Sequence, residues 1–396
     1  MTTLRALVIH NYYRSENASG ENLSVNDEIR GLRSLGWDVE VISADSDMIG
    51  SGTIPLSTLA VRPIYSRSSV VRVRDAVHRV RPHVALVENL FPLHSPWVIR
   101  ELSRLGVPVA AGVRNYRMIC AASTLFRNGS ICHDCVGSKI NLPAVQHGCY
   151  QDLRIRTAPL AASLALHRPT FRSVARFLAV SEFVRDELIA AGFDDERIVV
   201  RPNFVADPGP PDGHPSDGFL FAGRITAEKG VAQMLEGWKR SEAWKLHRLR
   251  IAGSGSLESL LVGLDPRLRV EPLGILSHDR ALEAIRDAAV TVVPSVWPEP
   301  FGRGVIEAAA FGRPSLASRS GGLESLVDDG ATGWLTEPDA DGLTAGFRRA
   351  MDTTDHAAFG RQARARFLER YTREASLGVL DRELRNLADT TGNLRR

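Results

Sequence analysis

The feature that most restricts the fold of this chain is a regular alternation of short apolar runs with longer amphipathic stretches. The stretches at 22–35 and 95–105 are typical of helices. Continuous apolar runs are typical of parallel strands that helices cover on both faces. The first half is therefore predicted to form a doubly wound α/β domain. Its predicted strands are 4–10, 39–43, 84–88, 107–113, 177–181 and 198–202.

The same pattern starts again after a segment rich in Pro, Gly and Asp at 206–215, which is typical of a linker. The sequence thus predicts a first domain at 1–205, a second domain at 216–372 and a cleft between them. In such sheets, ligands bind outside the carboxyl ends of the strands. The strands predicted for the second domain are 218–223, 249–253, 270–274, 290–294, 314–318 and 333–336.

Length and charge narrow the function classes. The chain has 396 residues, which suggests two or three domains. Its 49 basic and 46 acidic residues nearly balance, and no basic run with interleaved aromatic residues occurs, so no nucleic-acid partner is expected. No apolar stretch is long enough to span a membrane, and the N-terminus lacks the apolar core of a signal peptide. We expect a cytoplasmic protein.

The most informative stretch runs from Pro294 to Glu307. A predicted strand leads into a loop that Pro298 and Pro300 stiffen, and a helix is predicted to follow at 304–311. The first N–H groups of a helix have no partners within the helix, and its dipole favours negative charge. The N–H groups near Gly302 and Arg303 are therefore predicted to hold a phosphate.

Two carboxylates flank this predicted phosphate site, Glu299 in the loop and Glu307 in the helix. A carboxylate repels phosphate but accepts hydrogen bonds from hydroxyl groups. A phosphate with hydroxyl-bearing groups on both sides describes a nucleotide sugar, with Glu307 on the ribose and Glu299 on the transferred sugar. The alternative is that both carboxylates are solvated surface charges.

Here the chain resembles the retaining glycosyltransferases of family 4, also called glycosyltransferase group 1. The residues that match are Glu299, Phe301, Gly302 and Glu307, then Gly312-Arg313-Pro314, Gly321-Gly322-Leu323-Glu324 and Gly330-Ala331-Thr332-Gly333-Trp334. The resemblance implies the GT-B fold, with two Rossmann-like doubly wound domains facing a central cleft. It also implies that a helix within 373–396 crosses back to complete the acceptor-binding first domain, and that the second domain binds the donor.

Another motif, which contains two basic residues, lies at the start of the second predicted domain. Arg224 follows a predicted strand, and Lys229 is expected in the first turn of the next helix. Two cations at such a junction suit a diphosphate. The pattern resembles the pyrophosphate site of the family, which also places Gly304 beside the donor. Taken alone, the two cations are more typical of solvated basic residues.

Two positions in the first domain are weaker candidates for donor contact. Gly20 lies in the turn after the first strand, where a glycine lets backbone approach a phosphate, although a plain turn glycine explains it nearly as well. Arg114 stands where family members commonly have a histidine that contacts the donor sugar or its phosphate. As a fixed cation, Arg114 could neutralise phosphate but could not accept a hydrogen bond.

All four cysteines, Cys120, Cys132, Cys135 and Cys149, lie in one short region with the spacing C-x11-C-x2-C-x13-C. This clustering is compatible with a structural zinc site, for which His133 and His147 are spare ligand candidates. The alternative is four reduced cysteines that pack as small apolar side chains.

A basic stretch at 154–176 follows the cysteines and is interrupted by Pro159 and Pro169. A basic amphipathic helix can lie on anionic lipid, so a peripheral contact at the inner face of the membrane is one hypothesis. A solvated helical face is the other.

The predicted reaction moves a sugar from a nucleoside-diphosphate sugar to an acceptor hydroxyl on a glycan, a lipid-linked glycan or a small natural product. Retention of anomeric configuration is implied by the resemblance. Arg224 and Lys229 would stabilise the leaving phosphate, and Glu299 would orient the sugar. No D-x-D motif occurs between the donor-binding elements, so no catalytic metal or organic cofactor is expected. The alternatives are a GT-B sugar-nucleotide epimerase or phosphorylase, and a non-catalytic binding or scaffold subunit.

Overall fold

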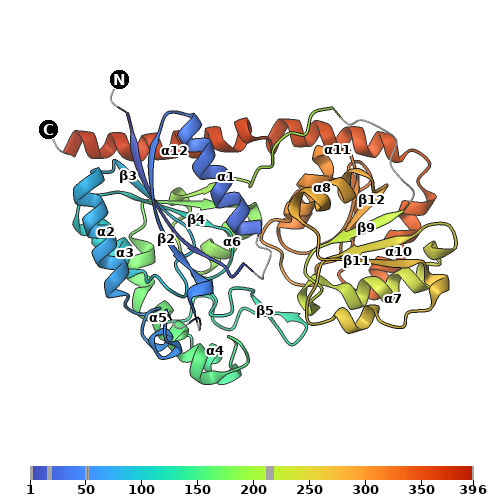
Figure 1. The fold of residues 1–396 in the computed structure, drawn as a ribbon, viewed down its shortest axis with the longest axis horizontal. Coiled ribbons are helices and arrows are strands. Elements are labelled where there is room, and N and C mark those ends of the chain that lie inside the picture. The colour runs from blue at the N-terminus through green and yellow to red at the C-terminus, as the bar shows by residue number, and fades with distance from the viewer. Residues whose placement is uncertain (1–2, 16–19, 50, 52, 211–217, 395–396) are drawn as a thin grey trace. The chain divides into compact units, whose positions relative to one another are not determined.

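A computed structural model of the chain describes residues 3–15, 20–49, 51, 53–210 and 218–394 (Figure 1). The chain divides into two compact units. Unit 1 comprises Met1–Leu125, Cys132–Arg201 and Ser376–Arg396, and unit 2 comprises Phe126–Ile131 and Pro202–Ala375. The linker predicted at 206–215 lies partly outside the described residues, as does the loop that precedes Gly20.

Unit 1 is built on a parallel six-stranded sheet with the order β2-β1-β3-β4-β7-β8. The register places Leu7 of β1 opposite Glu40 of β2 and Ala85 of β3. All six strands predicted for the first half are present, with ends that differ slightly from the predicted ones. The strands are β1 (Arg5–Tyr12), β2 (Asp38–Asp45), β3 (Val84–Val87), β4 (Val109–Val113), β7 (Arg176–Ala179) and β8 (Ile198–Val200).

The last helix, α12 (Arg373–Leu394), packs with α1 (Gly20–Ser34) on the core of unit 1. Leu377, Leu380 and Leu384 of α12 join the same buried apolar cluster as residues of β1, β3 and α1. The two helices approach closely at Gly31, where an added Cβ would lie 2.6 Å from a methyl group of Leu377. The other helices of unit 1 with eight or more residues are α2 (Arg67–Val80), α3 (Trp97–Arg104), α5 (Arg154–Arg172) and α6 (Glu182–Ala190).

Unit 2 repeats this architecture with a second parallel sheet of order β11-β10-β9-β12-β13-β14. Edge-to-face contacts among Phe219, Trp238 and Phe347 form the centre of its core. Its strands, all predicted, are β9 (Phe219–Ala222), β10 (Leu249–Ala252), β11 (Val270–Gly274), β12 (Val290–Val293), β13 (Ser315–Ser318) and β14 (Gly333–Thr336). Its longer helices are α7 (Val231–Ser241), α8 (His278–Arg286), α9 (Arg303–Ala310), α10 (Ala340–Asp352) and α11 (His356–Arg370).

A short antiparallel hairpin, β5 (Phe126–Arg127) and β6 (Ser130–Ile131), is an element that the sequence analysis did not predict. Its turn residues, Asn128 and Gly129, have φ values of 52° and 78°. An Asn-Gly pair with two positive φ angles is the strongest short-range hairpin signal, so the sequence did contain it. The short helix α4 (Leu142–His147) follows.

Helix α5 corrects one expectation. It continues through Pro159 and Pro169, where an interruption was predicted. A proline inside a helix costs about 3 kcal/mol, and here a face that buries Leu160, Leu164 and Phe171 offsets it. His167, one of the basic side chains of this stretch, is fully buried and lies 2.8 Å from the carbonyl oxygen of Ile64. Within the described ranges, no helix is long and apolar enough to cross a bilayer.

Candidate functional site

The stretch singled out in the sequence forms the loop from β12 to α9 in unit 2. Gly302 precedes α9 with φ 106°, and an added Cβ there would lie 2.4 Å from a methyl group of Leu323. Both constraints require glycine, which explains why the helix begins directly after it. The dipole of α9 favours negative charge at its N-terminus, so this end can hold an anion.

Glu299 is the central polar side chain of this loop. Its Oε2 accepts hydrogen bonds from Lys229 Nζ at 2.6 Å, Ser295 Oγ at 2.9 Å and Trp297 Nε1 at 3.0 Å. Burial opposes ionisation of the carboxyl group, but Lys229 and the other two donors outweigh it and hold the pKa of Glu299 below its usual value. Glu299 is therefore a fixed, ionised carboxylate at neutral pH.

The sheet order explains why Lys229 and Glu299 meet although they are far apart in the sequence. β9 and β12 are hydrogen-bonded neighbours, with Phe219 opposite Val290. The loops that leave their carboxyl ends therefore lie side by side. Lys229 lies in a short 3-10 turn, η4 (Ala227–Lys229), and not in the first turn of α7 as predicted. Its ammonium group also lies 5.2 Å from the centroid of the Trp297 ring.

Backbone contacts fasten the loop on both sides. Val296 N–H donates to the carbonyl of Glu228 at 3.0 Å, and Gly322 N–H donates to the carbonyl of Glu299 at 2.6 Å. Gly230, with φ 71°, leaves room for the loop, because an added Cβ would lie 1.8 Å from the carbonyl oxygen of Pro294. The backbone of Glu299 is thus held by main-chain bonds, and its carboxylate by side chains.

The remaining predicted residues of unit 2 lie near this loop with partners of their own. The side chain of Arg224 is 48% exposed and pairs with Glu228 at 3.1 Å. Arg303 Nε donates to Glu307 Oε1 at 2.8 Å across one turn of α9. The Phe301 side chain is buried and packs edge-to-face near Tyr371, so only its backbone is open to a ligand role.

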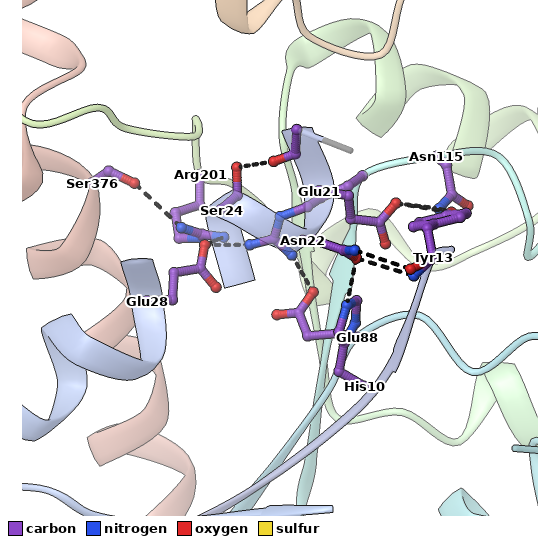
Figure 2. Close-up of polar contacts among 12 residues, drawn as sticks. His10, Tyr13, Glu21, Asn22, Ser24, Glu28, Glu88, Asn115, Arg201 and Ser376 are labelled. Carbon is purple, nitrogen blue, oxygen red and sulfur yellow. Dashed lines mark hydrogen bonds and ion pairs between the residues drawn. The ribbon is translucent and has the colours of Figure 1, made fainter. Parts of the chain in front are cut away.

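In unit 1, Arg114 is part of a buried ion cluster, of which Figure 2 labels Glu28, Glu88 and Arg201. Its guanidinium donates to Glu28 and to Glu88. Arg201 donates to Glu28 at 2.5 Å and to Ser376 of α12 at 3.3 Å. A contact of Arg114 with a donor phosphate stays a prediction, and it would require Arg114 to leave the buried Glu28 and Glu88.

The two carboxyl groups of this cluster differ in charge state. Burial opposes ionisation of Glu28, but Arg114 and Arg201 together hold its pKa below the usual value. Burial raises the pKa of Glu88 to about 8. Arg114 opposes this rise, whereas the negative charge of Glu28 adds to it. Glu88 is thus largely protonated at neutral pH. Gly20, the other candidate of unit 1, is the first residue of α1, and its carbonyl accepts from Ser24 Oγ at 2.9 Å.

The structural zinc prediction gains no support. None of the four cysteines forms a disulfide, and the described part of the chain contains no group of three or more His, Cys, Asp or Glu side chains that could hold a metal ion. Burial raises the pKa of Cys135 to about 11, and the other three cysteines add to this rise. His133 lies 3.0 Å from Glu187 instead of among the cysteines.

Two doubly wound parallel sheets, one of them with a polar strand-to-helix loop at a helix N-terminus, define a Rossmann-like α/β protein. More specifically, the chain belongs to the glycosyltransferase group 1 family. The family model described as glycosyl transferases group 1 matches residues 213–366, and the glycosyl transferase 4-like domain matches residues 19–203. Together the two matches account for most of the chain.

Curated relatives match over shorter stretches. An uncharacterized glycosyltransferase of Methanocaldococcus jannaschii is 34% identical over 137 residues, 33% of this chain and 35% of the relative. Glycogen synthase of Mycobacterium tuberculosis is 37% identical over 154 residues, 37% of this chain and 36% of the relative. The chain thus spans about a third of the length of these relatives. An uncharacterized 42.6 kDa protein from the cps region of Klebsiella pneumoniae is 31% identical over 274 residues, 66% of this chain and 64% of the relative.

Solved structures match over the full chain and show the fold. Sucrose-phosphate synthase from Thermosynechococcus elongatus has a TM-score of 0.72 at 18% identity and covers 98% of this chain and 100% of the other. Anabaena HepE, solved in complex with UDP-glucose, has a TM-score of 0.64 at 15% identity over 98% and 100% of the two chains. The fold is GT-B, as the sequence predicted.

Proposed function

We propose that this chain is a retaining, metal-independent glycosyltransferase that moves a sugar from a nucleoside-diphosphate sugar to an acceptor hydroxyl. The observation that supports it most is the Lys229–Glu299 pair at 2.6 Å beside the N-terminus of α9. A cation, a fixed carboxylate and the positive end of a helix dipole in one place match the charges and hydroxyls of such a donor.

The roles follow from these positions. The diphosphate binds Lys229, Arg224 and the N–H groups at Gly302 and Arg303. Arg224 can turn from Glu228 to the phosphate at little cost, because exposed ion pairs contribute only about 0–1 kcal/mol. In the reaction, negative charge develops on the leaving phosphate, and these preorganised donors stabilise it.

Glu299 and Glu307 recognise the hydroxyl groups at the two ends of the donor. Glu299 orients the transferred sugar, and three hydrogen bonds to Oε2 hold its carboxylate in place. Glu307 binds the ribose, with Arg303 fixing its orientation through the 2.8 Å bond. A carboxylate can accept from two neighbouring hydroxyls at once, which suits both rings.

We assign acceptor binding to the domain at 1–205 with 373–396, and donor binding to the domain at 216–372. HepE has been solved with UDP-glucose, so UDP conjugates are the first donors to test. Glycogen synthase among the relatives supports a glycan acceptor, with lipid-linked glycans and small natural products as the other acceptor classes. Work at the cytoplasmic face of the membrane is compatible with this proposal.

The test is release of nucleoside diphosphate from a panel of UDP-, GDP- and ADP-sugars, followed by chromatography with and without added glycan. We expect one donor class to be consumed by the wild type, and Lys229→Met to lower the rate at least a hundredfold. If every donor is left intact although a nucleotide binds, the scaffold alternative replaces the enzyme. A changed sugar released without any acceptor dependence would favour the epimerase.

A further inference from the structure

Trp297 contacts both members of the Lys229–Glu299 pair. Its indole Nε1 donates to Glu299 Oε2 at 3.0 Å, and the Lys229 ammonium group lies 5.2 Å from the centroid of its ring. Only 8% of the residue is exposed, so the ring offers no free face on which a base or a sugar could stack. Trp297 therefore supports this site from behind and does not form the surface that a ligand meets.

Ser295 is a second neutral donor to the same carboxylate. Its Oγ donates to Glu299 Oε2 at 2.9 Å, and the residue is buried. Together with Lys229, three donors therefore converge on one oxygen atom. All three bonds go to Oε2, which leaves Oε1 as the oxygen that can accept from a hydroxyl group of the donor sugar.

Hydrogen bonds to the backbone keep the two neutral donors in place. The N–H of Val296, which lies between them in the sequence, donates to the carbonyl of Glu228 at 3.0 Å. The buried hydroxyl of Ser320 donates to the carbonyl of Trp297. Neither bond involves the side chain of Lys229, so the indole and the hydroxyl stay directed at Oε2 when that side chain moves.

Lys229 has to serve two anions once a donor is bound. Burial raises the pKa of Glu299, and Lys229, Ser295 and Trp297 lower it, in that order of influence. When a phosphate shares the ammonium group, the strongest of these favourable contacts weakens. Hydrogen bonds from an uncharged hydroxyl and indole to the carboxylate persist, because they do not depend on the charge of the lysine.

We propose that Trp297 and Ser295 are positioning residues of the transferase site, which keep the Glu299 carboxylate directed at the sugar while Lys229 binds the leaving phosphate. The ring of Trp297 also attracts the ammonium group and so keeps it within reach of both anions. This assignment rests on the proposed function, because it takes a phosphate as the second partner of Lys229. Loss of either neutral donor should slow the reaction more than it weakens nucleotide binding, since the nucleotide does not bind Glu299.

The kinetic test uses Trp297→Phe, which keeps an aromatic ring without the indole N–H, and Ser295→Ala, with the UDP-, GDP- or ADP-sugar that the wild type consumes. Each variant should lower kcat about tenfold or more, while the KM of that sugar nucleotide and the Kd of its nucleoside diphosphate change less than about twofold. Trp244→Phe is the matched control and should keep the wild-type kcat. Trp244 also has a lysine over its ring, Lys245 at 5.6 Å, and its Nε1 donates to the carbonyl of Lys239. Full kcat in both site variants, or nucleotide binding lost in step with kcat, would overturn the proposal.

A second experiment needs no donor and shows whether Ser295 acts through Glu299. Ser295→Ala should lower the melting temperature by about 2–4 °C in the wild type. In the Glu299→Ala background it should cause no loss, because the hydroxyl has no carboxylate to bond there, and equal losses in the two backgrounds would contradict the proposal. If the wild type consumes no donor while this coupling is present, the proposed function fails and the contact with Glu299 stands. Donor turnover with full kcat in both site variants would instead exclude the positioning role and leave the function intact.

Discussion

Lys229 Nζ lies 2.6 Å from Glu299 Oε2 and joins the loops that leave two adjacent parallel strands, β9 and β12. The lysine and glutamate side chains are 20% and 12% exposed, so water screens the pair only in part. The pair does two things at once: it stabilises the loop, and it keeps a cation and a carboxylate where a sugar phosphate would need both.

Lys229→Met should therefore destabilise unit 2 by about 1–3 kcal/mol, because it leaves the largely buried Glu299 carboxylate without its cation. The matched control is Lys245→Met, which removes an exposed pair with Glu242 of similar length, 2.7 Å. That change should fall within about 0.5 kcal/mol of wild type. Urea denaturation of both variants measures the difference, and equal stabilities would contradict a structural role for the pair.

The raised pKa of Glu88 predicts a pH dependence of stability. A carboxyl group that holds its proton up to about pH 8 in the folded state, but loses it near its ordinary pKa when unfolded, makes stability fall as the pH rises between those values. Glu88→Gln removes this loss. We expect the variant to exceed wild type by about 1–3 kcal/mol at pH 8 and to approach it near pH 5. Thermal unfolding across this range checks it, and parallel curves for the two proteins would be evidence against it.

Gly230→Ala should lower the free energy of unfolding by more than about 1 kcal/mol, because the position has φ 71°. A clash adds to this loss, since an added Cβ would lie 1.8 Å from the Pro294 carbonyl oxygen. Gly378→Ala in α12 is the control. An added Cβ meets nothing within 4 Å there, so it should stabilise the protein by about 0.5–1 kcal/mol. Opposite shifts in melting temperature are the expected result, and a stable Gly230→Ala would show that the loop is not packed as described.

Features that depend on residues close together in the sequence were predicted better than features that depend on tertiary contacts. The strands of both sheets follow from local apolar runs, and Glu299 and Glu307 follow from a short motif at one junction. Ser295 and Trp297, which hold Glu299, were missed although they lie in the same loop. The sequence signal that could have identified them is their position 4 and 2 residues before Glu299.

Other features depend on tertiary neighbours that no local pattern shows. Arg114 was predicted to face a phosphate because its position in the motif was known while its partners, Glu28 and Glu88, were not. Glu28 comes from α1 and Arg201 from just after β8, so their pairing follows only from the sheet order. The Lys229–Glu299 pair likewise depends on β9 lying beside β12.

The measurement that tests the central claim most directly is calorimetric titration of UDP, GDP and ADP into wild type, Glu307→Ala and the control Glu369→Ala, which changes an exposed carboxylate of α11. We expect one nucleotide to bind the wild type and the control with equal affinity. Glu307→Ala should bind it at least tenfold more weakly, because the ribose hydroxyls lose their acceptor. Unchanged affinity in Glu307→Ala, or no binding of any nucleotide by the wild type, would contradict the placement of a donor site at the β12–α9 loop.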